Sequence, residues 1–166
     1  KLAEISALVR HKEYEPRERL FSSGEPIAGI YIIRYGAVKL LRGDEDGNES
    51  IVSILRVGDF YGGDSMFHNS HSRETAVAME ATGICFIPEG GLRALLGRDP
   101  DIALKIIQYY SSQHVRNMNM LEILASGDSM RRVCRFLLWQ NQQDLSRVTL
   151  SQEEIARMLG LAPETL

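Results

Sequence analysis

The stretch GDFYGGDSMFHNSHSRETAV, residues 58–77, contains side chains of the kind that bind a phosphate. Gly62 and Gly63 would let a backbone turn approach a ligand closely and present its N–H groups to an anion. Arg73 lies further along, and a guanidinium pairs well with phosphate oxygens. Glu74 follows it directly, and a carboxylate there would repel the same anion. The pattern indicates either a phosphate site or the remnant of one.

The C-terminal sequence VTLSQEEIARMLGLAPETL carries the signals of a short helix, a turn and a second helix. Ser151 and Glu154 form a predicted capping box, in which each side chain accepts the other residue's backbone N–H. Gly160 suits the left-handed conformation that ends a helix, and Pro163 suits the first turn of the next one. This order is typical of a helix-turn-helix, whose second helix enters the major groove of DNA. Spacing alone would equally permit an ordinary hairpin of two helices.

These sites need elements to position them, and the clearest is a long helix. From Asp101 onward apolar side chains recur at helical spacing, and Ser126 and Gly127 end the pattern. A helix of about 25 residues is roughly 37 Å long, more than a small domain can cover. We therefore expect a parallel homodimeric coiled coil, the alternative being a helix that packs only along its own domain. The expected dimer interface consists of Ile107, Tyr110, His114, Met118, Leu121 and Leu124.

Before Pro88 the chain consists of short apolar runs separated by turn signals. The runs are RERLF, GIYIIRYGAVKLL, SIVSILRVGDF, TAVAME and ATGICFIP. Their length and their enrichment in Ile, Val, Tyr and Leu are typical of an all-β sandwich or roll. Asp46, Gly47 and Asn48 predict a hairpin turn, because these residue types accept positive φ. Beyond the long helix, GDSMRRVCRFLLWQNQQ predicts an amphipathic helix whose arginines, Arg131, Arg132 and Arg135, either face solvent or approach phosphates.

Composition excludes several classes of protein. With 44% hydrophobic and 25% charged residues the chain is typical of a soluble globular protein, and no apolar run reaches the roughly 18 residues that span a bilayer. We expect a cytoplasmic location and no membrane contact. The net charge of −3 argues against nucleic-acid binding unless a basic segment follows Leu166. Cys85 and Cys134 lack metal-ligand spacing, and no nucleophile–base pair indicates an enzyme.

With a roll, a long helix and a helix-turn-helix in this order, the sequence resembles the Crp/Fnr family of bacterial transcription regulators. The resemblance covers about Leu20 to Leu166. It rests on GEP at 24–26, YIIRYGAVKLL at 31–41, DGNE at 46–49, GDFYGG at 58–63, Arg73, the long helix, and LSQEEIARMLGLAPETL at 150–166.

This resemblance implies an α+β fold with three parts. An N-terminal antiparallel β-roll (a double-stranded β-helix) that senses an effector would occupy 1–98, and a dimerisation helix would occupy 99–126. The start of a winged helix-turn-helix would occupy 127–166, with the wing beyond Leu166. The implied function is a homodimeric DNA-binding transcription regulator. It would bind double-stranded DNA at a palindromic operator, work with RNA polymerase and respond to a small-molecule or redox effector.

The resemblance also implies which residues contact DNA. Glu164 and Thr165 match the positions that read bases, and a Glu in the groove can accept from a cytosine amino group. Pro163 stands where cyclic-AMP-responsive members often have Arg, which puts a cAMP-receptor-type operator in doubt. Ser151 and Gln152 are expected to contact phosphates.

In nucleotide-binding members of the family, a Glu after the second Gly of the motif binds the ribose, and an Arg followed by Ser binds the cyclic phosphate. The resemblance therefore places Arg73 with its side chain pointing inward, while Gly63 replaces the Glu and Glu74 replaces the Ser. Arg73 would then pair with Glu74 or Asp64, and Asp64 could substitute for the ribose ligand if the turn shifts. The expected effector site consists of Gly62, Gly63, Asp64, Arg73, Glu74, Tyr109, Tyr110 and Ser112.

Other members of the family sense other signals on the same scaffold. Cys85 matches one iron–sulfur ligand, but residues 1–12 lack the three further thiols that such a cluster takes. Haem would need an axial ligand, for which four histidines are available: His11, His68, His71 and His114. An iron–sulfur cluster and a cyclic nucleotide are less favoured than haem or another small molecule.

The sequence disfavours two functions from other classes. A stand-alone cyclic-nucleotide-binding module without DNA binding is disfavoured by the helix-turn-helix at the C-terminus. A cupin-type enzyme would need a His/Glu metal cluster in the β region. Only His68 and His71 lie there, which is too few ligands.

Overall fold

The computed structural model describes residues 9–44, 47, 49–63, 71–142 and 150–162. They fall into two compact units, Lys1–Ile106 and Ile107–Leu166. Each unit has its own apolar core.

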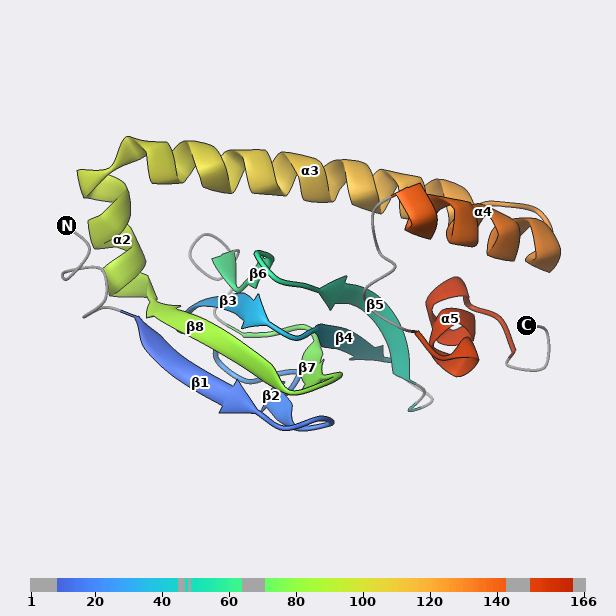
Figure 1. The fold of residues 1–166 in the computed structure, drawn as a ribbon, viewed down its shortest axis with the longest axis horizontal. Coiled ribbons are helices and arrows are strands. Elements are labelled where there is room, and N and C mark those ends of the chain that lie inside the picture. Colours follow the sequence, from blue (N-terminus) through green and yellow to red (C-terminus); the bar gives the residue numbers. More distant parts are fainter. Residues whose placement is uncertain (1–8, 45–46, 48, 64–70, 143–149, 163–166) are drawn as a thin grey trace. The chain divides into compact units, whose positions relative to one another are not determined.

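The first unit contains two four-stranded antiparallel sheets (Figure 1). One sheet has the order β1-β8-β3-β6 and the other the order β2-β7-β4-β5. The strands are β1 Arg10–Tyr14, β2 Arg19–Phe21, β3 Gly29–Tyr35, β4 Val38–Gly43, β5 Glu49–Leu55, β6 Phe60–Tyr61, β7 Thr75–Ala78 and β8 Thr82–Pro88. The expected hairpin joins β4 to β5, and Gly47 has a φ of 84°. Asp46 and Asn48 of that turn lie outside the described residues.

Side chains from both sheets form the core of the roll. Ile33, Val38 and Ile84 are almost completely buried there, and Phe21 stacks on Tyr61 with ring centroids 5.0 Å apart. Each of Ile33, Val38 and Ile84 is followed along its strand by a less buried residue, as expected where one face of a sheet packs on the core and the other does not. The strongly apolar runs of the sequence therefore correspond to β3, β4, β5, β7 and β8.

A short helix, α2 (Glu89–Arg98), follows β8 and packs on the outer face of the first sheet. Leu92 and Leu95 are buried against Ile30 and Ile87. The sequence patterns did not predict this helix, because Gly90, Gly91 and Gly97 weaken its helical signal. Tertiary burial of the two leucines compensates for that low propensity.

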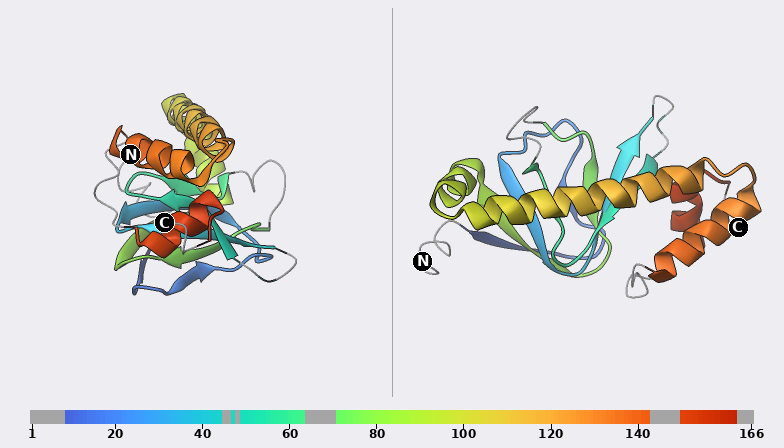
Figure 2. Two further views of the ribbon diagram at one scale, coloured as in Figure 1. Left: turned by 90° about the vertical axis from the view of Figure 1, so that its right-hand side faces the viewer. Right: turned by 90° about the horizontal axis from the view of Figure 1, so that it is seen from above.

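The second unit consists of the greater part of α3 (Pro100–Leu124), together with α4 (Ser129–Gln142) and α5 (Gln152–Leu159). The right-hand view of Figure 2 shows α3 as one continuous helix, with α4 turning back from its end. Phe136 and Leu159 are buried with Ile123 at the centre of this unit. A roll, a long helix and a helical C-terminal region confirm the expected α+β fold class.

Candidate effector cradle and nucleic-acid interface

The glycine turn of the roll follows β6. Gly62 has a φ of 99°, and a Cβ on it would collide with the carbonyl oxygen of Gly29. Only glycine tolerates both conditions, so this position fixes a close approach of two backbone segments. Gly63 is buried beside it. The expected ligand Asp64 lies outside the described residues.

The two residues Arg73 and Glu74 have opposite orientations from those expected. Arg73 is exposed, whereas Glu74 is only 8% exposed. Both residues lie in a bend just before β7, and this bend leaves Arg73 at the surface while it buries the Glu74 side chain. The expectation that the Arg73 side chain points inward is therefore wrong, and its pairing with Glu74 is wrong as well. The acidic side chain takes the inward position.

Glu74 is held inside the roll by three side chains. Arg42 on β4 pairs with one carboxylate oxygen. The Tyr61 hydroxyl donates to the other oxygen over 2.6 Å. Ser72 lies beside this pair, with its Oγ 2.9 Å from the Tyr61 hydroxyl and 3.1 Å from the Glu74 backbone nitrogen, which donates to it. We call Gly62, Gly63, Ser72 and Glu74 the effector cradle.

This network decides the charge that the effector cradle presents. A phosphate within about 4 Å of the Glu74 carboxylate would be repelled by on the order of 4 kcal/mol at an effective dielectric constant near 20. Among the residues that the structure describes, the cation bonded to Glu74 is Arg42, whose side chain is 52% exposed and already pairs with that carboxylate. The effector cradle therefore combines the expected glycine turn with a buried carboxylate that is paired with Arg42.

The remaining expected effector residues lie on α3 in the second unit. The Ser112 hydroxyl donates to the Tyr109 carbonyl over 2.7 Å, and Gln113 Nε2 donates to the Tyr109 hydroxyl over 2.7 Å. Tyr110 is 42% exposed. Their part in effector binding stays a prediction.

An exposed apolar stripe runs along α3. Five of its members are at least 45% exposed: Leu104, Ile107, Val115, Met118 and Leu121. His114 is exposed on the same helix, but Leu124 packs against the core of the second unit. The coiled-coil spacing of alternately three and four residues is followed by positions 104, 107, 111, 114, 118 and 121, of which position 111 is a Ser. Val115 and Tyr110, the latter expected in the interface, each lie one position away from this spacing.

The capping box expected at the start of α5 is confirmed. The Glu154 backbone nitrogen donates to Ser151 Oγ over 3.2 Å, and the Ser151 nitrogen donates to Glu154 Oε2 over 3.1 Å. Gly160 ends the helix with a φ of 61°. Gln152 is the first residue of α5 and is exposed. The predicted DNA-binding residues Pro163, Glu164 and Thr165 lie outside the described residues.

The three arginines of α4 make different contacts. Arg132 donates to the carbonyl oxygen of Leu159 over 2.8 Å and so connects α4 to the end of α5. Arg135 donates to Ser126 Oγ over 3.2 Å. Arg131 is exposed, with its Nε 3.7 Å from Asp128. Two of the three arginines therefore stabilise the helix-turn-helix region internally.

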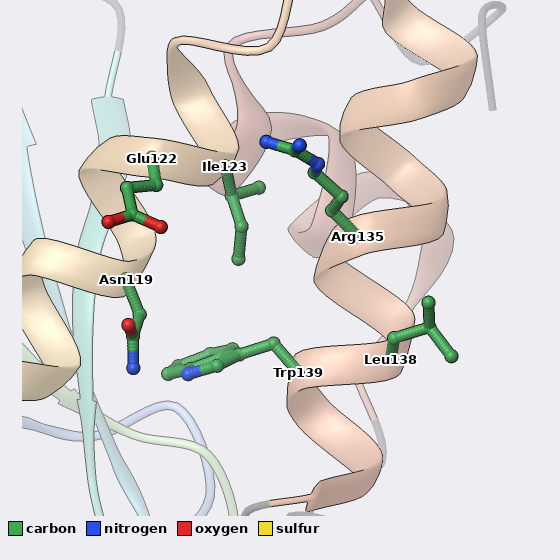
Figure 3. A pocket seen from close by; sticks show the side chains of 6 residues that line it. All are labelled: Asn119, Glu122, Ile123, Arg135, Leu138 and Trp139. Carbon is green, nitrogen blue, oxygen red and sulfur yellow. The ribbon is translucent and has the colours of Figure 1, made fainter.

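A shallow pocket of about 280 Å³ lies between the end of α3 and α4 (Figure 3). It is lined by Asn119, Glu122, Ile123, Arg135, Leu138 and Trp139. The Trp139 ring lies beside the end of the Asn119 side chain, and its Nε1 is buried. Among the residues that the structure describes, no group of three or more His, Cys, Asp or Glu side chains could hold a metal ion.

Two family models match the chain. The cyclic nucleotide-binding domain matches residues 11–99, which is more than half of the chain, and the Crp-like helix-turn-helix domain matches residues 131–166. The chain belongs to the Crp/Fnr family. The family's two defining parts thus correspond to the roll with α2 and to the region that starts within α4.

Curated relatives of this Crp/Fnr protein are regulators. It is 28% identical over 165 residues to electron transport regulator A of Shewanella oneidensis. This alignment covers 95% of this chain and 66% of that protein. The fumarate and nitrate reduction regulatory protein of Vibrio cholerae is also 28% identical, over 95% of this chain and 66% of that protein. The anaerobic regulatory protein of Pasteurella multocida is 27% identical, over 95% of this chain and 60% of that protein. The chain thus spans less than two thirds of the length of these relatives.

Solved structures show the same fold. FixK2 from Bradyrhizobium japonicum aligns over 95% of this Crp/Fnr chain and 80% of its own, with a TM-score of 0.77 and 23% identity. The c-di-GMP responsive regulator CLP from Xanthomonas campestris aligns over 98% of this chain and 85% of its own, with a TM-score of 0.81 and 23% identity. Within the described part of the chain, none of the helices has the length and apolar character needed to cross a membrane.

Proposed function

We propose that the protein is a DNA-binding transcription regulator whose activity depends on an effector sensed by the β-roll. The observation that carries this proposal is the α4–α5 region. It has the capping box, the left-handed Gly160 and the match to a Crp-like helix-turn-helix up to residue 166. The regulators among its relatives support the same function. The second helix of the motif would begin at Pro163, with Glu164 and Thr165 reading bases.

The proposed regulator is a homodimer that pairs through α3. The exposed stripe on this helix includes Ile107, Met118 and Leu121, and a single helix leaves it open to water. Burying such side chains in an interface stabilises the association by about 25 cal/mol per Å² of apolar surface removed from water. A second copy in parallel orientation would supply an identical stripe with the same 3.5-residue repeat. The two recognition helices would then face successive major grooves, about 34 Å apart.

The effector of this regulator is proposed to differ from a free cyclic nucleotide. The Glu74 carboxylate occupies the inward position of the effector cradle and would repel a phosphate. A neutral or cationic small molecule fits this charge better than an anion does, and haem would fit only with its anionic propionates turned away from Glu74. An absorption spectrum of protein purified without oxygen separates the classes. A Soret band would indicate haem, a broad band near roughly 400 nm a cluster, and a featureless visible region an organic effector.

Control of DNA binding is proposed to be a two-state change. The segment between α3 and α4 spans residues 125–128, and rotation about this hinge would change the separation of the recognition helices. An effector can shift such an equilibrium only by the difference in its affinity for the two states. Contact with RNA polymerase is part of the same proposal and follows from the function of a transcription regulator.

Selection from random double-stranded DNA tests the proposal. We expect enrichment of a palindromic site, and an affinity that falls with rising salt as phosphate contacts release counterions. Glu164→Ala should cost about 1–3 kcal/mol and relax the preference at one base pair of each half-site. Gln152→Ala, a phosphate contact, should weaken binding to every sequence equally. Equal binding to selected and random DNA by effector-loaded protein would exclude the proposed function.

A further inference from the structure

The pocket between the end of α3 and α4, called the α3–α4 pocket below, is built from one face of each helix (Figure 3). Its α3 wall consists of Asn119, Glu122 and Ile123, and its α4 wall of Arg135, Leu138 and Trp139. In both helices the three residues are spaced i, i+3 and i+4, which places their side chains on the same side of the helix. The two helices therefore present facing sets of side chains to one small cavity.

The base of the α3–α4 pocket is apolar and contains an unpaired donor. Ile123 is buried in the core of the second unit, and Trp139 packs against Phe136. The indole Nε1 of Trp139 is buried and has no hydrogen-bond partner among the residues that the structure describes. Nearly all buried donors in proteins are paired, so an unpaired one needs an explanation. An acceptor atom of a bound molecule would pair with this N–H.

The two walls carry opposite charges. Glu122 is exposed on α3, and no ion pair of its carboxylate is found within the described part of the chain. Arg135 on α4 donates from Nη1 to Ser126 Oγ over 3.2 Å, and its guanidinium has further N–H donors. Figure 3 shows the Ile123 side chain between these two charged groups. A ligand can therefore meet an acid on one side and a base on the other.

This distribution of charge selects the chemistry of a ligand. Glu122 would repel a simple anion and Arg135 a simple cation, whereas a molecule with both charges is attracted by both walls. The volume of about 280 Å³ lies just below the roughly 300–1,000 Å³ of sites for drug-sized ligands, so the occupant is small. A small zwitterion satisfies both conditions.

We propose that the α3–α4 pocket binds a free α-amino acid. The ligand carboxylate accepts from Arg135 and from the Nε1–H of Trp139. The ligand ammonium group donates to Glu122, and the Asn119 amide oxygen beside it provides a second acceptor. The side chain of the ligand lies toward Leu138, which is 64% exposed at the edge of the pocket.

Binding in the α3–α4 pocket would act on the hinge. The ligand connects α3 to α4, and residues 125–128 join these helices. A bound ligand therefore favours the hinge angle at which both walls reach it. The seam of the proposed dimer leaves the pocket open, because Leu121 and Ile123 lie on opposite sides of α3. The effect on the hinge rests on the proposed function, whereas binding of the amino acid does not.

The experiment titrates the L-amino acids other than tryptophan, one at a time, into full-length protein without DNA and measures heat by isothermal calorimetry. We expect at least one to bind with a dissociation constant of about 1 mM or lower. Its amide and its N-acetyl derivative should each bind at least about tenfold more weakly, because each loses a charge-assisted hydrogen bond. Trp139 is the single tryptophan of the chain, so its fluorescence should change with the same saturation curve.

Two variants assign the charges. Arg135→Gln should remove the preference for the free acid over its amide, and Glu122→Gln should remove the preference for the free amine over its N-acetyl derivative. Both side chains are exposed, so both variants should fold, which circular dichroism checks. Arg131→Gln is the matched control, because Arg131 lies on the same helix outside the pocket and should leave the affinity unchanged.

Three results would overturn the proposal. The first is the absence of binding by every amino acid at millimolar concentration. The second is binding that leaves the fluorescence of Trp139 unchanged, since the ligand would then lie elsewhere. The third is a set of ligand preferences that is the same in the parent protein and in folded Arg135→Gln and Glu122→Gln. Because no DNA is present, each of these results leaves the proposed DNA-binding function standing.

Discussion

Arg42 on β4 and Glu74 just before β7 form an ion pair within the β-roll. The Glu74 side chain is 11% exposed and that of Arg42 52%, so the carboxylate is inside and its partner reaches in from the surface. With Tyr61 donating to the second carboxylate oxygen, Glu74 has partners on both oxygens. The roll thereby contains a buried carboxylate of its own next to the glycine turn that was expected to approach a phosphate.

Replacing Glu74 should convert the effector cradle into an anion site. In Glu74→Ser the carboxylate is gone, and Arg42 becomes available to an incoming phosphate. Removing a repulsion on the order of 4 kcal/mol corresponds to about a thousandfold gain in affinity. We expect cyclic AMP binding to become measurable by isothermal calorimetry. Adding Gly63→Glu should strengthen it further by supplying a ligand for the ribose.

Two variants separate this explanation from a general change in the roll. Arg42→Gln in the Glu74→Ser background should abolish the gain, because no cation would then replace the lost partner. Glu80→Ser removes an exposed carboxylate from the β7–β8 connection and should produce no binding. Absence of measurable heat for cyclic AMP with the folded Gly63→Glu, Glu74→Ser double variant would contradict the assignment of the cradle.

The α3 stripe predicts a charge-sensitive dimer. Met118→Asp and Leu121→Asp place carboxylates in the proposed seam, where two copies would bring like charges together in an apolar interface. Each change should shift the dimer toward monomer by at least about tenfold in dissociation constant, measured by sedimentation velocity. Lys105→Asp on an exposed position outside the seam should leave the dimer intact. Unchanged sedimentation of both seam variants would assign the stripe another role.

Stability at alkaline pH should depend on Tyr31. Burial, and secondarily the charge of Glu25, raises the pKa of the Tyr31 phenol above its ordinary value of 10.0. The folded state therefore keeps the proton while the unfolded chain loses it. The resulting stability is fully present below about pH 10 and is lost as the pH rises through the folded pKa. Tyr31→Phe keeps the ring packing and should lose less stability in urea titrations across this window than the parent protein does. Equal losses in the two proteins would contradict this prediction.

Local sequence signals predicted the parts of the molecule that local chemistry determines. The hairpin at Gly47, the capping box of Ser151 and Glu154, and the end of α5 at Gly160 are all in place. Each depends on one or two residues with a strong backbone or hydrogen-bonding preference. The apolar runs of the central strands were equally clear, since their burial requires no knowledge of a distant partner.

Elements that depend on tertiary packing were missed. Strand β1, with the sequence RHKEY, is exposed at four of its five positions, so no apolar pattern marks it. It exists because it pairs with β8. The orientation of Arg73 and Glu74 was inverted for a related reason. Which of these two residues in the bend is buried depends on distant partners, and the partner that makes a buried Glu74 tolerable, Arg42, lies 32 residues away in the sequence.

Arg132 should stabilise the helix-turn-helix region more than its neighbour Arg131 does. Arg132 donates to the Leu159 carbonyl at the end of α5 over 2.8 Å and to the Ser126 carbonyl over 3.4 Å. Loss of a hydrogen bond from a charged donor typically costs about 1.5–3 kcal/mol. Arg131 is exposed and pairs loosely with Asp128, so its removal should cost well under about 1 kcal/mol.

The single tryptophan of the chain makes this comparison selective for the second unit. Trp139 lies on α4 and packs against Phe136, with ring centroids 6.0 Å apart. Its fluorescence therefore follows unfolding of the second unit, whereas the far-ultraviolet signal of the β-roll follows the first. We expect Arg132→Ala to lower the denaturant midpoint of the fluorescence transition and Arg131→Ala to leave it nearly unchanged. Equal midpoints for the two variants would mean that the Arg132–Leu159 bond does not connect α4 to α5 in solution.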